Sequence, residues 1–367
     1  MASVPSVTSW TPCRTQHHFH PLFWMGSEMT LKKLVFGRIT QRSGMTATVL
    51  AIVTLVVTQP GLVAQLSYTS GQPVYTAYEG WEVDEDGSRY FVFGYMNENW
   101  EEEPHVPVGP DNYVVAGQDG RELGTFDPEK AARGQPTRFL PLRNRFVFRV
   151  PIPEGYGVDD EMIWSLTTHG ETVTAHGTLS LDYRVDGLIR ASEQGAIGAG
   201  TSNPTIRANV APMLRVEGQP QRTVRVGEPL PLVAVATDDG VPEPRRRRVR
   251  RGRRTSTGAA DSPSDNPLWR RPSQTTPGSA RGLRFSWYVY RGAGKVSFDP
   301  LQAKVWEDSR AHTNSPWANF WETPPLPEDD TWRVEATFHK PGTYVLRALA
   351  SDGALNVDSD VMVTVTP

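Results

Sequence analysis

The sequence predicts an all-β protein made of two antiparallel β-sandwich domains, the second immunoglobulin-like, with an arginine-rich insert that we expect to be disordered. Short runs of aromatic and β-branched residues recur between Gly, Pro, Asn and Asp turns, which is typical of sandwich strands. No stretch after the leader keeps a helical period over three turns. The 367 residues are enough for two hydrophobic cores.

We expect residues 1–64 to be a leader that contains a signal peptide. A basic segment precedes the apolar run Ala47–Val57, which is too short for a membrane-spanning helix of about 20 residues. Cleavage after Ala64 would release a secreted or periplasmic chain, and we expect no transmembrane anchor in that mature chain. Residues 1–28 precede the signal and are interpreted as an over-extended start. The one cysteine, Cys13, lies there, so we expect no thiol chemistry in the mature chain.

The first domain is expected over residues 65–190. Its strands are predicted where alternating or aromatic-rich runs lie between turn residues. Most aromatic side chains between Trp81 and Trp100 should belong to the core, although the set could include a platform on which a sugar stacks. The predicted strands are Ser88–Met96, Tyr113–Ala116, Arg145–Val150, Met162–Thr168 and Thr172–Leu181.

A hairpin is predicted around Gly170-Glu171, with His169 paired to Thr172. This register places polar residues on one face and Trp164, Leu166, Val173 and Ala175 on the other. His169 and His176 would then be too far apart to share a metal, and we interpret them as solvated strand residues.

The segment from Glu98 to Asp111 is acidic and rich in proline, so we expect a long loop. Its carboxylates could bind Ca²⁺. They lack the alternation of oxygen ligands found in known calcium loops, which favours a solvated acidic surface.

Several motifs of the first domain resemble those of an uncharacterised family of exported bacterial proteins. The resemblance covers most of the mature chain and implies export. It assigns no activity, cofactor, catalytic residue or binding residue. The motifs are Tyr78–Trp81, Asp86–Ser88, Phe93–Trp100, Val106–Asn112, Gly134–Phe139 and Trp164–Gly170.

Residues 191–208 are small, polar and Gly-rich, and they are predicted to link the two domains. The second domain, residues 209–367, shows the alternation of an immunoglobulin-like sandwich. Its predicted strands are Met213–Glu217, Thr223–Val226, Leu230–Thr237, Leu283–Tyr290, Lys295–Phe298, Trp332–Phe338, Thr343–Ser351 and Val361–Thr366. The runs Phe338–Leu346, Ala350–Gly353 and Val361–Val365 resemble polycystic-kidney-disease-type and other immunoglobulin-like repeats of exported proteins.

Five acidic residues of the second domain could gather at strand ends and bind calcium. An Asp-Gly turn needs the same residues for its own backbone, and we favour this interpretation. The five are Asp238, Asp239, Asp352, Asp358 and Asp360.

The arginine-rich insert, residues 241–282, interrupts the second domain. Residues 243–281 hold eleven Arg and three acidic residues, a local net charge of +8, with few aliphatic side chains. An anionic polymer such as lipopolysaccharide or an acidic glycan could bind it in a salt-dependent way. Nucleic acid is not an expected partner of an exported protein, and the acidic first domain is an intramolecular alternative. The candidate contacts are Arg245, Arg246, Arg247, Arg248, Arg250, Arg251, Arg253 and Arg254.

A second departure from the immunoglobulin-like pattern is the loop Pro300–Asp330, which is rich in Pro and Trp. Its prolines keep it out of the sheet. Its aromatic side chains could therefore form an exposed ligand-contact patch, or they could fold over one sheet as a lid on the core. The candidates are Trp306, Trp317, Phe320 and Trp321.

These observations favour a non-catalytic binding or structural module of the cell envelope, with a glycan, an envelope component or an exported protein as partner. The sequence has no Gly-x-Ser-x-Gly, His-Glu-x-x-His or Walker-type motif. We therefore predict no catalytic residue, no metal site and no cofactor. The alternative is a glycan-active enzyme with an accessory immunoglobulin-like domain, in which two carboxylates would lie about 5 to 10 Å apart in an aromatic-lined cleft. The oligomeric state is not predicted.

Overall fold

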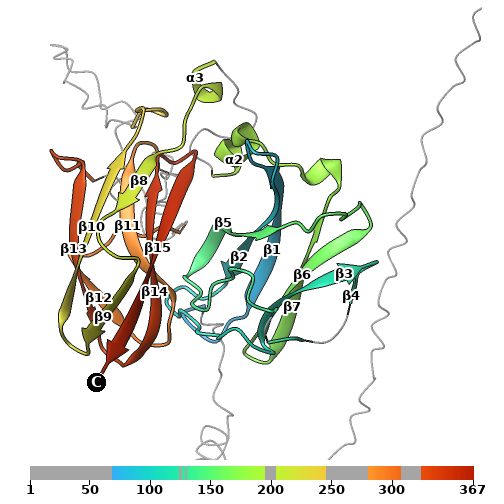
Figure 1. Ribbon diagram of the computed structural model, residues 1–367, viewed down its shortest axis with the longest axis horizontal. Helices are drawn as coiled ribbons and strands as arrows, with labels where there is room; N and C mark the ends of the chain where they lie inside the picture. Colours follow the sequence, from blue (N-terminus) through green and yellow to red (C-terminus); the bar gives the residue numbers. More distant parts are fainter. Residues whose placement is uncertain (1–67, 124–125, 129, 195–203, 245–279, 307–323) are drawn as a thin grey trace, which may run out of the picture. The chain divides into compact units, whose positions relative to one another are not determined.

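Two β-sandwiches lie within the compact unit Leu66–Pro367 of the computed structural model (Figure 1). The structure describes residues 68–123, 126–128, 130–194, 204–244, 280–306 and 324–367. The predicted leader and most of the arginine-rich insert lie outside these ranges. Within them, no helix has the length and apolar character needed to cross a bilayer.

The first sandwich, blue to green in Figure 1, combines a three-stranded and a four-stranded sheet, both antiparallel. The sheet orders are β1-β2-β5 and β4-β3-β6-β7. In the lettering of immunoglobulin sandwiches these are A-B-E and C′-C-F-G. The strands are β1 (Val74–Val83), β2 (Arg89–Asn97), β3 (Asn112–Gln118), β4 (Arg121–Glu122), β5 (Leu142–Pro151), β6 (Asp160–Thr168) and β7 (Glu171–Thr178).

Aromatic side chains fill the core of the first sandwich. Trp164 of β6 packs edge-on against Phe148 of β5, with ring centroids 4.9 Å apart, and stacks on Phe139 at 6.3 Å. The Trp164 indole N–H donates to Asn112 Oδ1 at 3.1 Å. The prediction that most of the aromatic set is core is confirmed by the burial of Trp81, Phe91, Phe93 and Tyr95.

The second sandwich, yellow to red in Figure 1, has the strand order of an immunoglobulin fold. Its sheets are β12-β13-β10-β8 and β11-β14-β15-β9, equivalent to D-E-B-A and C-F-G-A′. β9 pairs parallel with β15, whereas its other strand pairs are antiparallel. The strands are β8 (Met213–Val216), β9 (Gln221–Arg225), β10 (Pro229–Thr237), β11 (Arg284–Arg291), β12 (Val296–Asp299), β13 (Thr331–Phe338), β14 (Gly342–Ser351) and β15 (Asn356–Thr366).

Two side chains that mark immunoglobulin sandwiches occupy their expected places. Tyr344, near the start of the F strand β14, donates its hydroxyl to the Lys340 carbonyl at 2.9 Å, which is a tyrosine corner. Trp287, on the C strand β11, is buried. Leu346 stands two residues after the corner tyrosine, where antibody domains place a disulfide cysteine. The predicted fold class is confirmed, and apolar packing takes the place of the disulfide.

Each strand predicted from the sequence overlaps a strand of the structure, and β1 and β4 are additional. Gly80 hides β1 in the sequence because it interrupts the apolar pattern. The register of β1 against β2 shifts between Tyr78 and Gly80, where Gly80 has φ +131°. A Cβ at this position would collide with the Tyr183 carbonyl, so only glycine fits this bulge.

The β6–β7 hairpin turns at His169-Gly170, so the predicted pairing of His169 with Thr172 is wrong. Thr172 pairs with Thr167 instead. His169 (φ 50°) and Gly170 (φ 82°) form a two-residue turn with positive φ at both positions. The register differs from the predicted one by two residues, which leaves the strand residues on their predicted faces.

Three short helical segments follow β7. They are the 3-10 helix η1 (Leu181–Tyr183), α2 (Gly187–Glu193) and α3 (Pro204–Arg207). The Asp186 carboxylate caps α2 by accepting the Ile189 N–H at 2.8 Å. Residues 195–203 of the predicted linker lie outside the described residues.

The motif Gly134–Phe139 contacts the end of β11. The Tyr290 hydroxyl donates to the Gly134 carbonyl at 2.5 Å. Arg291 donates from Nε and Nη2 to the Gln135 carbonyl at 3.0 and 2.7 Å. This motif therefore connects the first sandwich to the second by hydrogen bonds.

Candidate functional site

Most of the predicted ligand-contact residues lie outside the described residues. This applies to Trp317, Phe320 and Trp321 and to the eight arginines between Arg245 and Arg254. Trp306 is described and half-buried, with the Lys304 ammonium 5.6 Å from its ring centroid.

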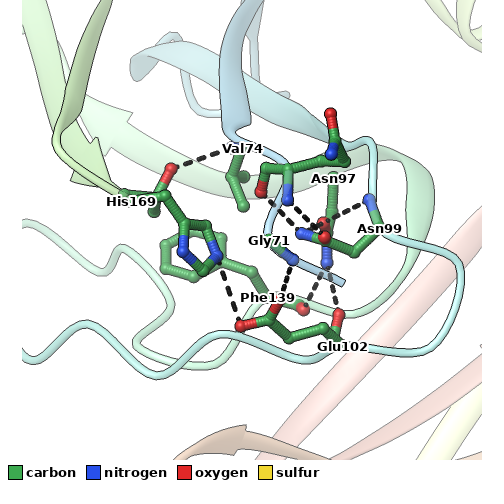
Figure 2. Close-up of polar contacts among 9 residues, drawn as sticks. Gly71, Val74, Asn97, Asn99, Glu102, Phe139 and His169 are labelled. Atoms are coloured by element: carbon green, nitrogen blue, oxygen red, sulfur yellow. Dashed lines mark hydrogen bonds and ion pairs between the residues drawn. The ribbon is translucent and has the colours of Figure 1, made fainter. Parts of the chain in front are cut away.

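A loop held by buried amides follows β2, and we call residues 97–103 the braced loop. Asn97 and Asn99 are fully buried. Asn97 Nδ2 donates to the carbonyls of Glu102 and Phe139 at 2.9 and 3.0 Å (Figure 2). Asn97 Oδ1 accepts the backbone N–H and the side-chain amide of Asn99 at 3.0 and 2.7 Å. Both donors and both acceptor positions of the Asn97 amide are therefore used.

Asn99 and Glu102 attach the braced loop to the chain that precedes β1. Asn99 exchanges two hydrogen bonds of 2.7 Å with the Gln72 backbone. Glu102 Oε2 accepts the Gly71 N–H at 2.6 Å, and Glu102 Oε1 lies 3.2 Å from His169 Nε2 (Figure 2). The interpretation of His169 as a solvated strand residue is therefore corrected, because it lies in a turn and pairs with this loop.

Two exposed aromatic side chains lie where the braced loop meets the chain that precedes β1. Trp100 is 41% exposed and Tyr68 is 42% exposed, and their rings stack with centroids 5.8 Å apart. The Trp100 N–H also donates to the Tyr68 carbonyl at 2.7 Å. Because backbone hydrogen bonds hold the pair in place, a ligand that stacks on it does not have to order it first.

Acidic residues are close to Trp100 in the sequence. Glu98, Glu101 and Glu102 belong to the braced loop itself. Partial desolvation, followed by the carboxylates of Glu171 and Glu98, raises the pKa of Tyr75. Of these carboxylates, Glu102 is already occupied by Gly71 and His169.

A second polar cluster, on the β6–β7 hairpin, joins a hydroxyl, an imidazole and a carboxylate. Thr174 Oγ1 lies 3.2 Å from His176 Nε2, and Glu161 Oε2 lies 2.9 Å from His176 Nδ1. The same order of groups activates nucleophiles in hydrolases. These residues lie on the exposed face of the hairpin, and none of the three lines the cleft described next.

A partly open cleft of about 60 Å³ lies between β5 and the outer face of β11, β14 and β15. We call it the basic cleft. Asp358 is the one carboxylate among its lining residues, so the cleft lacks the pair of carboxylates that glycoside hydrolysis requires. Its charged lining consists of Arg143, Arg145, Arg284, Lys304, Arg347 and Asp358.

The candidate calcium ligands of the second sandwich serve turns and ion pairs. Asp238, Asp239 and Asp352 each accept backbone N–H groups two or three residues ahead. The other two candidates, on β15, have oxygens 3.3 and 2.7 Å from Nε of Arg347. In the described part of the chain, no group of three or more His, Cys, Asp or Glu is placed to hold a metal. The contacts of the first three support the turn interpretation, whereas Asp358 and Asp360 lie within β15 and pair with Arg347.

Comparison with known proteins gives no functional assignment. No family model matches the sequence, and no curated protein matches it. Among solved structures, the N-terminal eight Ig domains of Down Syndrome Cell Adhesion Molecule align at 11% identity over 80% of this chain and 27% of that chain, with a TM-score of 0.20. The titin domains Z1Z2 in complex with telethonin align at 11% identity over 79% of this chain and 96% of that chain, with a TM-score of 0.19. At these scores the alignments carry no functional argument, and the fold assignment rests on strand order and the tyrosine corner.

Proposed function

We propose that this chain is an exported, non-catalytic binding module that holds a neutral glycan of the cell envelope on the Tyr68–Trp100 pair. The observation that carries this proposal is the exposure of two stacked rings, Tyr68 before β1 and Trp100 on the loop fixed by buried amides. A pyranose ring offers an apolar C–H face to an aromatic ring, while its hydroxyls donate to carboxylates. Loops carried on a sandwich scaffold are also where such folds place binding residues.

Export is supported by the basic segment and short apolar run that precede Gln59-Pro60. Expression of the full chain in a bacterium, followed by fractionation and N-terminal sequencing, tests it. We expect a processed chain that begins at Gln65 outside the cytoplasm. An unprocessed chain retained in the cytoplasm would contradict export and leave the binding test below unaffected.

Binding is tested with the full chain on an array of neutral and acidic glycans at low and high salt. We expect binding to a neutral glycan that resists salt, because no ion pair with the ligand is involved. Trp100→Ala and Tyr68→Ala should each weaken it about tenfold, since stacking and apolar burial are lost. Tyr183→Ala is the matched control, because Tyr183 is 52% exposed on η1, in a different part of the first sandwich.

Two results would contradict the proposal. The first is equal loss of affinity in Trp100→Ala and Tyr183→Ala. The second is binding that disappears at high salt and also on deletion of residues 243–281, which would assign adhesion to the arginine-rich insert.

A further inference from the structure

β12 (Val296–Asp299) is an edge strand of the second sandwich, because β13 is its one neighbour in the sheet. The outer side of an edge strand has backbone groups that no strand uses, and proteins commonly block it with a proline, a bulge or a lysine. β12 contains no proline, and its register against β13 has no bulge. Lys295 precedes the strand, but Asp299 at the other end balances its charge.

The register of β12 against β13 shows which backbone groups face this edge. The His339 N–H donates to the Lys295 carbonyl at 3.1 Å, and Val296 is paired with Phe338. In an antiparallel ladder, residues that bond the neighbouring strand alternate with residues whose backbone groups point away from it. Val296 and Phe298 therefore direct their N–H and C=O groups to the edge. Within the described residues, neither makes a backbone hydrogen bond outside the β12–β13 pair.

β11, an edge strand of the other sheet, shows the opposite situation. Gln302 Oε1 accepts the Trp287 N–H at 3.0 Å, and the Tyr290 carbonyl accepts the Thr137 N–H at 3.2 Å. Segments from outside the sheet thus use backbone groups of β11. This edge is protected against pairing with another chain, whereas the described residues place no such contact along β12.

The side chains along β12 are self-complementary. Val296 and Phe298 pack against the core and are partly buried, whereas Lys295, Ser297 and Asp299 are exposed. The order is therefore cation, apolar, hydroxyl, apolar, anion. When two copies pair antiparallel about Ser297, each Lys295 lies opposite Asp299 of the second copy. Each Val296 then lies opposite Phe298 of the second copy, and these two residues exchange both of their backbone hydrogen bonds.

A neighbour on β13 gives Asp299 a reason to bind a cation from another chain. Asp299 stands directly opposite Glu335 in the ladder. Like charges in this position destabilise a sheet. Among the described residues, neither the Lys295 ammonium nor the Asp299 carboxylate has an ion-pair or hydrogen-bond partner. A lysine from a second copy would relieve the repulsion between Asp299 and Glu335.

We propose that this protein forms a symmetric dimer in which β12 pairs antiparallel with β12 of a second copy, centred on Ser297. The pairing joins the two D-E-B-A sheets into one continuous sheet. Registers shifted by two residues keep the backbone bonds but place Lys295 or Asp299 opposite Ser297. The proposed register alone satisfies both charged ends. Because the paired strands are short, the dimer exchanges with the monomer in solution.

Sedimentation equilibrium of the full chain over a range of concentrations tests this proposal, and we expect a reversible monomer–dimer equilibrium. Lys295→Asp and Asp299→Lys should each raise the dissociation constant of the dimer about tenfold or more, because attractive contacts become repulsive. The double variant exchanges the charges within each pair and should restore dimerisation. Arg215→Asp is the matched control, because Arg215 is 74% exposed on β8, the opposite edge of the same sheet.

A disulfide across the symmetry axis tests the register independently. Opposite residues that do not bond each other have Cα atoms about 4.5 Å apart, a distance that a disulfide can span. Ser297→Cys in a Cys13→Ser background should therefore form a covalent dimer under mild oxidation. Thr337→Cys in the same background should not, because Thr337 lies opposite Ser297 on β13, away from the edge.

Four results would overturn the proposal. They are a chain that stays monomeric at every concentration, a double charge variant that dimerises no better than the single variants, equal cross-linking of Ser297→Cys and Thr337→Cys, and loss of the dimer on deletion of residues 243–281. None of these measurements uses a glycan, so failure here and failure of the proposed function are distinguishable.

Discussion

The two sandwiches have related strand orders but bury different polar groups. In the first sandwich, amides dominate among the buried polar side chains. In the second, hydroxyl and charged groups take their place. The buried amides are Asn97, Asn99, Asn112, Gln135 and Asn144, and the buried polar groups of the second sandwich are Ser286, Arg347, Ser351 and Asp352.

This difference shows two ways of fixing loops on the same architecture. An amide donates and accepts at once and does not titrate, so it holds backbone groups equally well at any pH. A buried charge needs a partner. Arg347 has several, including the Val147 carbonyl at 2.8 Å and the Tyr290 ring at 3.5 Å. We therefore expect the first sandwich to respond weakly to pH and the second to respond more strongly.

We expect the largest loss of stability when a buried amide of the first sandwich is replaced by a carboxylate. Asn97→Asp places a carboxylate against the Glu102 and Phe139 carbonyls, which now accept from Nδ2. An uncompensated buried charge of this kind should lower the free energy of unfolding by about 3–5 kcal/mol at pH 7.

The reverse exchange, Asp352→Asn, should cost only about 1 kcal/mol, because the backbone bonds to the remaining oxygen survive. Urea denaturation at pH 7 measures both variants. Similar losses in the two variants would contradict the distinction between the sandwiches.

The two core tryptophans provide the next test. The Trp164 indole N–H donates to Asn112 Oδ1, whereas the indole N–H of Trp287 is buried with no hydrogen-bond partner within the described residues. Trp164→Phe leaves a buried acceptor without its donor, while Trp287→Phe removes an unsatisfied donor. We expect the first variant to cost about 1–3 kcal/mol more than the second in chemical denaturation. The reverse order would show that ring packing, not hydrogen bonding, decides the difference.

A smaller difference should separate two tyrosines. Tyr95 Oη accepts the buried Leu140 N–H at 2.8 Å, whereas Tyr344 Oη donates to a carbonyl. Tyr95→Phe leaves a backbone N–H without a partner and should cost about 2 kcal/mol, against about 1 kcal/mol for Tyr344→Phe. Thermal unfolding of both variants beside the parent chain measures this. Equal shifts of the melting temperature in the two variants would mean that water replaces the Tyr95 hydroxyl as the acceptor for the Leu140 N–H.

The smallest effect concerns pH. Burial, followed by backbone bonding that opposes it and then the Asp352 charge, raises the pKa of Asp238 from 3.8 to about 6. The protonated form is thus favoured in the folded chain, and its stabilising contribution is present below pH 3.8 and is lost as the pH rises through 6. Asp238→Asn should therefore leave stability unchanged near pH 4. At pH 7 it should raise stability by about 1 kcal/mol, less than the full shift implies, because the residue is half-exposed. Melting temperatures of Asp238→Asn and of the parent chain, measured between pH 4 and pH 7, test this prediction. A gain in stability at pH 4 equal to that at pH 7 would contradict the raised pKa of Asp238.

The strands were predictable because their signal is local. The alternation of buried and exposed residues along β10 and β14 is visible within ten residues of sequence. The run that leads into the tyrosine corner at Tyr344 is equally local. β1 was missed because Gly80 breaks its pattern, and the backbone contact that requires this glycine comes from Tyr183, about a hundred residues later.

The candidate sites were less predictable because their partners are distant in the sequence. The spacing of Asn97 and Asn99 before Trp100 could have suggested a structured loop, but nothing local indicates that the chain near Gln72 returns to it. Arg143 and Arg347 meet in one cleft although about two hundred residues separate them. The resemblance motifs, read from the structure, include the buried amides Asn97, Asn99, Asn112 and Gln135, which are structural supports.

The position of β15 has a consequence for the order of folding. This strand lies between β14 and β9, so both of its edges are hydrogen-bonded. Its partner β9 is the second strand of the same sandwich, so the C-F-G-A′ sheet closes only when the last strand reaches the first part of the domain. Such non-local pairing slows folding and leaves strand edges exposed on a growing chain. The second sandwich therefore cannot fold progressively from its first strands, and a chain released without Asn356–Thr366 would depend on chaperones to remain in solution.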